Sequence, residues 1–130
     1  MRVVFDSNVL VAALVFPGGK ADEALGRVIA GVDQLLVSTP IIQEVLGVLS
    51  RKFSRDREEL ARVAVYLADL GERIESTHHM NVLVDEPDNR ILECAVSGKA
   101  DAIVTGDQAM LRLGEYGDVS IITLRDFLAR

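Results

Sequence analysis

The sequence lacks several features that particular protein classes require. Cys94 is the only cysteine in 130 residues. No disulfide can therefore form within the chain, and a reducing compartment such as the cytoplasm is expected. The longest apolar run, from Val9 to Phe16, is far too short to span a bilayer. Asp6 lies where a secretory signal needs uncharged residues, so no export signal and no membrane partner are predicted.

Positive charge is also scarce. The chain has 14 Lys and Arg residues against 20 Asp and Glu residues, which gives a net charge of −6. Such a balance argues against a generally basic surface for nucleic acid. An acidic pocket that holds metal would explain part of the deficit, and the basic residues could still gather on one side. With 49% hydrophobic and 26% charged residues, the composition predicts one globular domain over residues 1–130.

Short apolar runs alternate with helical spacings along the chain. The runs predict strands or extended segments at residues 3–5, 34–38, 73–77, 81–84, 102–105 and 119–122. The spacings predict helices at residues 9–16, 21–31, 39–53, 56–70, 88–97, 108–113 and 123–130, with Thr39 and Asp88 as N-caps. This alternation indicates an α/β fold with a parallel sheet covered on both faces.

Two carboxylates directly follow buried strands. Asp6 ends the run Val3-Val4-Phe5, and Asp107 follows Ile103-Val104-Thr105-Gly106. Parallel strands present their carboxyl ends at one edge of the sheet, which is where ligands bind in open α/β sheets. We therefore expect Asp6 and Asp107 to lie at the same edge.

Two more acids fall within apolar helix faces. Glu44 is three residues after Ile41 and four before Val48, which puts it inside the apolar stripe of its helix. Asp88 is in line with Ile91 and Leu92 and faces the core side of the following helix. A carboxylate in such a position is usually neutralised, paired or bound to metal.

Each acid also has an ordinary interpretation. Asp6 and Asp88 could serve only as helix caps, Asp107 could be a turn residue, and Glu44 could pair with an arginine. One metal site would explain all four acids together. Carboxylates at about 4 Å repel each other by about 4 kcal/mol at an effective dielectric constant near 20. Oxygen-only ligands favour Mg²⁺ or Mn²⁺.

Other acidic and imidazole side chains are expected to play no catalytic part. Asp101 enters its strand at the opposite edge, and Asp126 belongs to a capping box that starts at Thr123. Glu93 points about 140° away from Asp88 around the helix, so solvent is its expected environment. The adjacent residues His78 and His79 lack metal-ligand spacing to another His or Cys.

Taken in order, these motifs resemble the PIN domain family. The matching stretches are Asp6-Ser7-Asn8-Val9-Leu10, the helix with Glu44, Asp88-Asn89-Arg90-Ile91-Leu92-Glu93-Cys94-Ala95, and Val104-Thr105-Gly106-Asp107. The likeness covers essentially the whole chain. It is strongest to the bacterial and archaeal branch of VapC-type toxins of toxin–antitoxin pairs. Ser7 stands where threonine is common in the family, which is a mild departure.

The resemblance implies a three-layer α/β/α sandwich with a mainly parallel sheet, and Mg²⁺- or Mn²⁺-dependent ribonuclease activity. It implies that Asp6, Glu44, Asp88 and Asp107 form the catalytic and metal-binding site, with Asn8 and Thr105 as polar supporting residues. It further implies a homodimer and a possible antitoxin partner.

The RNA backbone would need cationic contacts. Arg90 lies two residues from Asp88, and Arg51 and Lys52 belong to a basic bunch between two helices. A solvated charge run is the alternative for that bunch. Two other functions stay open: a phosphatase of the haloacid dehalogenase type, and a PIN-like module that binds RNA or a partner with little catalysis.

Overall fold

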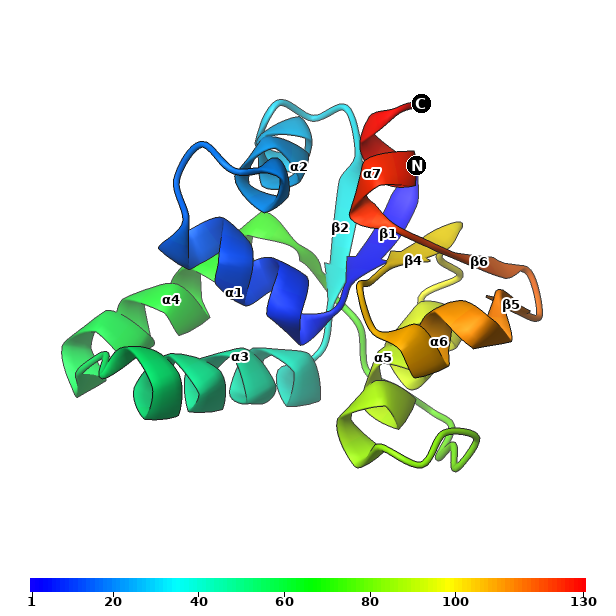
Figure 1. The fold of residues 1–130 in the computed structure, drawn as a ribbon. Helices are drawn as coiled ribbons and strands as arrows, with labels where there is room; N and C mark the ends of the chain where they lie inside the picture. The colour runs from blue at the N-terminus through cyan, green and yellow to red at the C-terminus, as the bar shows by residue number, and fades with distance from the viewer.

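A computed structural model of the protein describes all residues from Met1 to Arg130. It contains six strands and seven helices in an α/β arrangement (Figure 1). In chain order these are β1 (Arg2–Phe5), α1 (Ser7–Val15), α2 (Lys20–Ile29), β2 (Gln34–Val37), α3 (Thr39–Phe53), α4 (Arg57–Leu70), β3 (Glu72–Arg73), α5 (Glu86–Ser97), β4 (Ala102–Val104), α6 (Gln108–Leu113), β5 (Glu115–Tyr116), β6 (Val119–Ile122) and α7 (Leu124–Leu128).

The strands form one mainly parallel sheet in the order β3-β2-β1-β4-β6-β5. Only β5 is antiparallel, and it pairs with β6. The central strand β1 pairs with β2 on one side and β4 on the other, with Val4 opposite Leu36 and Ile103. These central strands are apolar on both faces because helices cover both faces of the sheet. The predicted α/β fold with a mainly parallel sheet is confirmed.

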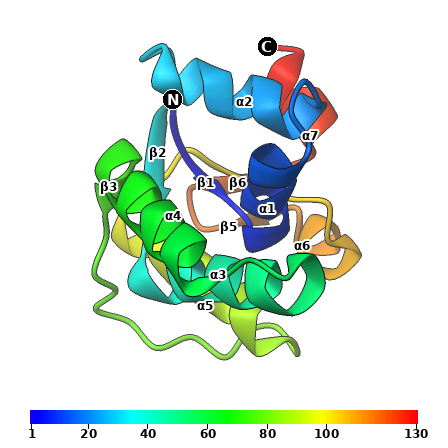
Figure 2. The same cartoon turned by 90° about the vertical axis from the view of Figure 1, so that its left-hand side faces the viewer.

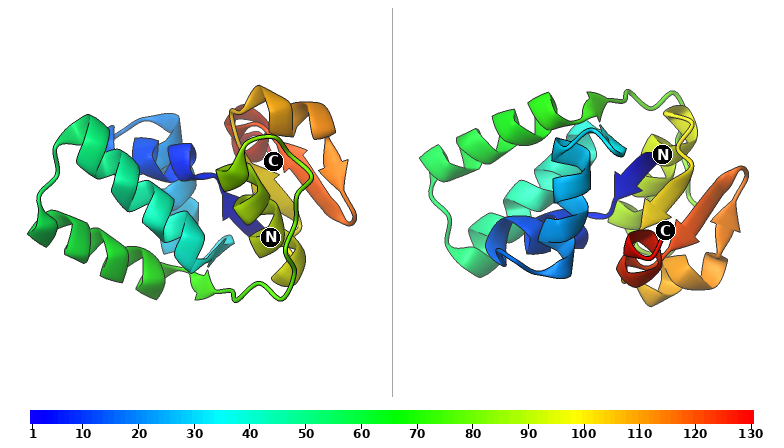
Figure 3. Two further views of the ribbon diagram at one scale, coloured as in Figure 1. Left: turned by 90° about the horizontal axis from the view of Figure 1, so that it is seen from below. Right: turned by 90° about the horizontal axis from the view of Figure 1, so that it is seen from above.

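The helices divide between the two faces. Helix α5 packs against β1, β2 and β4, whereas α1 packs against β1, α2 and α3. Helix α2 lies beside the short C-terminal helix α7 (Figure 2). Helices α3 and α4 form an antiparallel pair that extends away from the sheet, and the segment after β3 runs round α5 (Figure 3). None of the helices combines the length and the apolar character needed to cross a membrane.

A buried acid that the sequence did not single out anchors the C-terminal helix. Asp33 is only 4% exposed and accepts hydrogen bonds from Arg130 (2.7 Å) and from the Met1 ammonium group (3.0 Å). Burial alone would raise the pKa of Asp33, but these two cationic partners outweigh it and lower the pKa. The ion pairs therefore join Met1 and Arg130, which follows α7, to the residue just before β2.

Several predicted element boundaries are wrong. The α3 N-cap is Ser38, whose hydroxyl accepts from the Ile41 amide, and not Thr39. Residues 73–77 contribute only the end of the two-residue strand β3, and residues 81–84 form no strand. This stretch is instead held by side chains of α5, a long-range interaction that local propensity does not reveal.

Candidate active site

The four acids predicted as a site line one pocket at the carboxyl edge of the sheet. Asp6 directly follows β1, Asp107 follows β4, Glu44 projects from α3 and Asp88 lies in the first turn of α5. The pocket has a volume of about 150 Å³. Its walls are Asp6, Ser7, Asn8, Glu44, Asp85, Pro87, Asp88, Ile91 and Asp107. Five carboxylates therefore line one small pocket.

Asp6 is held rigidly at the end of β1. The backbone N–H groups of Asn8 (2.6 Å) and Val9 (3.2 Å) both donate to its Oδ1 atom, so Asp6 also caps α1. The buried Thr105 hydroxyl donates to Oδ2. Burial raises the pKa of Asp6, against the lowering effect of these three hydrogen bonds. The cap interpretation and a site role are therefore compatible for this residue.

Thr105 connects two of the acids. Its Oγ1 donates to Asp6 and accepts a hydrogen bond from the Asp107 backbone N–H at 3.0 Å. The carboxylate of Asp107 accepts from the Met110 amide at 3.0 Å and so caps α6. Thr105 is completely buried, which leaves its hydroxyl no alternative partner in solvent. The Thr105 hydroxyl thus links the Asp6 carboxylate to the β4–α6 connection, in addition to the backbone pairing of β1 with β4.

Asp88 is the most perturbed acid of the pocket. It is 7% exposed, and its buried Oδ2 atom has no hydrogen-bond partner. Burial, followed by repulsion from Asp107, Asp85, Asp6 and Glu44, raises its pKa to about 7. The prediction that Asp88 caps the helix is wrong, because Asp85 occupies the N-cap position of α5. An ordinary capping role therefore does not explain Asp88.

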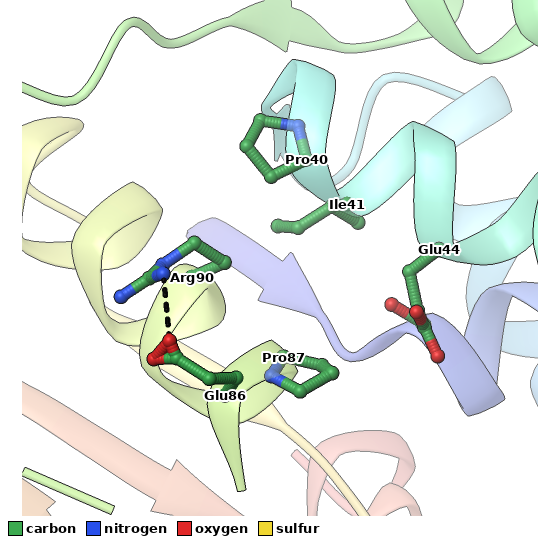
Figure 4. Close-up of a pocket in the computed structure, with 7 residues that line it drawn as sticks. Pro40, Ile41, Glu44, Glu86, Pro87 and Arg90 are labelled. Atoms are coloured by element: carbon green, nitrogen blue, oxygen red, sulfur yellow. Dashed lines mark hydrogen bonds and ion pairs between the residues drawn. The ribbon is translucent and has the colours of Figure 1, made fainter. Parts of the chain in front are cut away.

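Glu44 faces the pocket without a cationic partner. No Lys, Arg or His nitrogen lies within 4.0 Å of its carboxylate, so the alternative of a pair with an arginine is not realised. Figure 4 shows Glu44 on α3 pointing towards the N-terminal turn of α5, while Arg90 bonds to Glu86 at 3.3 Å on the other side of Pro87. Glu44 thus remains an unneutralised wall of the pocket.

The donor set of the pocket fits a hard divalent cation. No three Asp, Glu, His or Cys side chains lie close enough together to form a complete metal site. All the pocket carboxylates nevertheless offer oxygen ligands, and the partnerless Asp88 Oδ2 lacks the stabilisation that a buried carboxylate needs. A cation between the acids would supply that stabilisation and relieve their mutual repulsion.

The Arg90 guanidinium is held by three partners within the protein, so it is less available to a substrate than its position in the sequence suggested. Its guanidinium bonds to Glu93 at 2.8 Å and to the Met80 carbonyl at 2.9 Å, in addition to Glu86. The prediction that Glu93 faces solvent is wrong: Glu93 is 6% exposed and accepts from the Met80 amide at 2.7 Å. The segment around Met80 folds over this face of α5, which helical periodicity alone does not show.

Asn89 is a structurally important residue that sequence reasoning did not identify. It is completely buried, and its side chain accepts from the amides of Val82 (3.0 Å) and Leu83 (2.8 Å) while donating to the Leu83 carbonyl (2.8 Å). These bonds hold the segment that leads into Asp85. The position of Asn89 three residues before Leu92, within the apolar stripe of α5, was the available signal for such a role.

The other predicted substrate-binding residues lie outside the pocket. Arg51 and Lys52 are exposed in the last turn of α3, about 10 Å along the helix axis from Glu44. The Arg51 guanidinium lies back over Gly47, where a Cβ atom would be 2.9 Å from Nη1. Arg51 therefore reaches one turn towards Glu44.

Comparisons with known proteins agree with the α/β fold. Residues 2–109 match the family model described as the PIN domain. An uncharacterised protein of Methanocaldococcus jannaschii, MJ1680, is 26% identical over 117 residues, which cover 87% of this chain and 75% of that protein. The fold is similar to VapBC2 from Rickettsia felis bound to a DNA fragment from their promoter, with a TM-score of 0.68, 14% identity and coverage of 95% and 98% of the two chains. It is equally similar to VapBC-1 from nontypeable Haemophilus influenzae, with a TM-score of 0.68, 13% identity and coverage of 96% and 99%.

Proposed function

Since the chain belongs to the PIN domain family, we propose that it is a metal-dependent ribonuclease that hydrolyses RNA phosphodiester bonds. The observation that carries this proposal is the buried, partnerless Oδ2 atom of Asp88, in a pocket walled by four further carboxylates. An anionic substrate would be repelled by that pocket unless a cation were present. The geometry is therefore suited to phosphate chemistry only in a metal-loaded form.

In this proposal Asp6, Glu44, Asp88 and Asp107 hold Mg²⁺ or Mn²⁺. When bound, the cation lowers the pKa of water and stabilises negative charge that develops on the phosphate oxygens. The Thr105 hydroxyl bonds to both the Asp6 carboxylate and the Asp107 amide, and so positions these two residues relative to each other. The exposed Asn8 side chain lines the pocket and offers an amide donor to a phosphate oxygen.

The hydrogen bonds of Asp6 argue against the phosphatase alternative. A nucleophilic carboxylate of the haloacid dehalogenase type needs an oxygen free to attack phosphorus. Both oxygens of Asp6 accept hydrogen bonds, Oδ1 from two backbone amides and Oδ2 from Thr105, which fixes the carboxylate and lowers its nucleophilicity while Oδ2 keeps one lone pair for a cation. This arrangement suits a fixed ligand rather than a nucleophile.

We further propose that the protein acts as the toxin of a toxin–antitoxin pair of the VapBC type, as a homodimer that an antitoxin chain holds inactive. The support is the similarity of fold to the VapBC structures of R. felis and H. influenzae over nearly the whole chain. Co-expression with the product of a neighbouring small gene, followed by co-purification, tests this part of the proposal.

Metal removal is the direct test of the ribonuclease proposal. The purified protein should cleave a defined single-stranded RNA in Mg²⁺ or Mn²⁺, lose cleavage in EDTA, and regain it when excess metal returns. Gel analysis of end-labelled RNA measures this. Cleavage that persists in EDTA would exclude a metal-dependent mechanism, and metal-dependent RNA binding without cleavage would favour the binding module.

Arg51 and Lys52 are proposed to contact the RNA backbone outside the pocket. Replacing both with alanine should weaken RNA binding about two- to tenfold at low salt. It should also reduce the slope of log affinity against log salt by about 1.4, because about 0.7 counterions are released per phosphate contact on a single strand. Fluorescence anisotropy across a salt series measures both effects.

The matched control for this pair is Arg62→Ala, which removes one exposed arginine of α4. It should change neither the affinity nor the slope. If the double variant behaves like Arg62→Ala, the α3 pair is an ordinary solvated charge run.

A further inference from the structure

A second cleft, with largely apolar walls, adjoins the acidic pocket. It has a volume of about 430 Å³ and lies between α1 on one side and α6 and α7 on the other. The residues on which the following argument depends are Asn8, Val9, Ala12, Gln108, Leu111 and Arg125. A cleft of this size and composition is typical of a site for a flat, partly apolar group.

The cleft and the acidic pocket share a boundary. Asn8 lines both, and Thr105, which bonds to Asp6 and to the Asp107 backbone, lines the cleft. Gly106 lies between these two positions, and space around it is open, since a Cβ atom there would meet nothing within 4 Å. A molecule whose phosphate lies at the acids therefore has its neighbouring group directed at the cleft.

The chemistry of the walls matches a nucleobase. The side chains of Val9, Ala12 and Leu111 offer apolar surface to the face of a base. The carboxamides of Asn8 and Gln108 belong to exposed residues, and each combines a donor and an acceptor that can pair with a base edge. Single-stranded RNA is usually recognised through such contacts to unstacked bases.

Arg125 adds a positive charge at the same cleft. Its side chain is 79% exposed and lies 3.5 Å from Asp126, so its guanidinium is only loosely held. A guanidinium can stack on a base or bind the adjacent phosphate in a bidentate manner. Apolar walls, two amides and one cation thus occur together, next to the carboxylates.

We propose that this cleft binds one nucleobase of the RNA, in the nucleotide next to the phosphodiester at the acidic pocket. The inference rests on the proposed ribonuclease function. It assigns Gln108 and Arg125 to substrate binding, Gln108 through the edge of the base and Arg125 through its face or the adjacent phosphate.

The test combines two variants with abasic substrates. Short single-stranded RNAs are prepared with one base removed at each position flanking the cleavage site. In the wild-type protein, one abasic position should lower kcat/KM about tenfold, mainly through KM. The double variant Gln108→Ala, Arg125→Ala should cleave intact RNA about tenfold more slowly and show no further loss with the same abasic RNA.

Controls separate this result from a general loss of folding or charge. Gln43→Ala and Arg112→Ala replace the same residue types at exposed positions outside the cleft, and both should retain the wild-type response to abasic RNA. Circular dichroism melting of every variant checks the fold. If the abasic RNA lowers kcat/KM equally in the double variant and in the wild type, the nucleobase assignment is overturned while the ribonuclease proposal stays intact.

Failure of the proposed function is distinguishable from failure of the cleft. If the wild-type protein cleaves no RNA, the ribonuclease proposal fails, and anisotropy with the same RNAs decides the cleft separately. Weaker binding of one abasic RNA by the wild type, and not by the double variant, would support the nucleobase site. Equal affinity for intact and abasic RNA would overturn it.

Discussion

Asp88→Asn is expected to remove catalysis and, at the same time, to stabilise the metal-free protein. Cleavage should fall about 10³-fold, or about 4 kcal/mol of transition-state stabilisation, because one oxygen ligand loses its charge. The melting temperature without metal should rise by about 5 °C at pH 8, since a buried negative charge facing other carboxylates is removed. Gel-based kinetics and calorimetry measure the two effects.

The pH dependence of the stabilisation follows from the pKa of Asp88. Burial and the neighbouring carboxylates raise it from 3.8 to about 7 in the folded protein. Between these values the folded state keeps a proton that the unfolded state has lost, so the free energy of unfolding falls as pH rises. The asparagine variant avoids this loss. Its advantage over the wild type should be absent below about pH 4, grow up to about pH 7 and stay constant above, with an upper limit of about 4 kcal/mol from the difference between these two pKa values.

Two comparisons test the cause of this effect. Mg²⁺ or Mn²⁺ should raise the melting temperature of the wild type at pH 8 and do so much less in Asp88→Asn, because the repulsion is already relieved. Asp69→Asn removes an exposed carboxylate of α4 and should change neither stability nor cleavage. A lower melting temperature for Asp88→Asn than for the wild type at pH 8 would contradict the electrostatic explanation.

The sequence predicted the features that depend on local pattern. Apolar strands such as Val3-Val4-Phe5, and an acid directly after them, indicate a parallel sheet whose carboxyl edge collects side chains. Thr123 caps α7 as its sequence pattern indicates, since its hydroxyl accepts from the Asp126 amide at 3.1 Å, although no hydrogen bond from the Thr123 amide to Asp126 completes a capping box. Such features need only the residues within one element and its turn.

The features that the sequence did not predict depend on contacts between distant segments. Glu93 is buried because the chain around Met80 crosses its face of α5, although helical periodicity places it opposite Asp88. Asp33 is buried because Arg130, 97 residues later, pairs with it. The two-residue strand β5 (Glu115–Tyr116) is too short to give a periodic signal and exists only through pairing with β6.

The structure gives Thr105, which the sequence indicated only as a supporting residue, a defined contact with each of two acidic residues. Its hydroxyl donates to Asp6 and accepts from the Asp107 amide, so one group positions acids from two different strands. The valine side chain has the same shape but can do neither. Thr105→Val should therefore leave a buried Asp6 oxygen and the partly buried Asp107 amide without partners, at a cost of about 2 kcal/mol in the free energy of unfolding.

The effect of Thr105→Val on activity should exceed the effect of its lower stability. Cleavage by folded protein should fall about 10- to 100-fold, and the metal concentration for half-maximal rate should rise, as is usual when a group that orients a metal ligand is lost. The Thr105 hydrogen bond lowers the pKa of Asp6, so the acidic limb of the pH–rate profile should also move to higher pH.

Thr105→Ser is the matched variant, because it keeps the hydroxyl and loses only a methyl group. It should show a metal dependence and a pH profile close to the wild type, with a stability loss of about 1 kcal/mol from the missing methyl group. A general packing defect would affect both variants in proportion to their stability loss. A positioning role requires that the pH profile and the metal dependence change only in Thr105→Val. If serine and valine shift them equally, the hydroxyl does not align Asp6 and Asp107, and the arrangement of the acids must depend on the backbone alone.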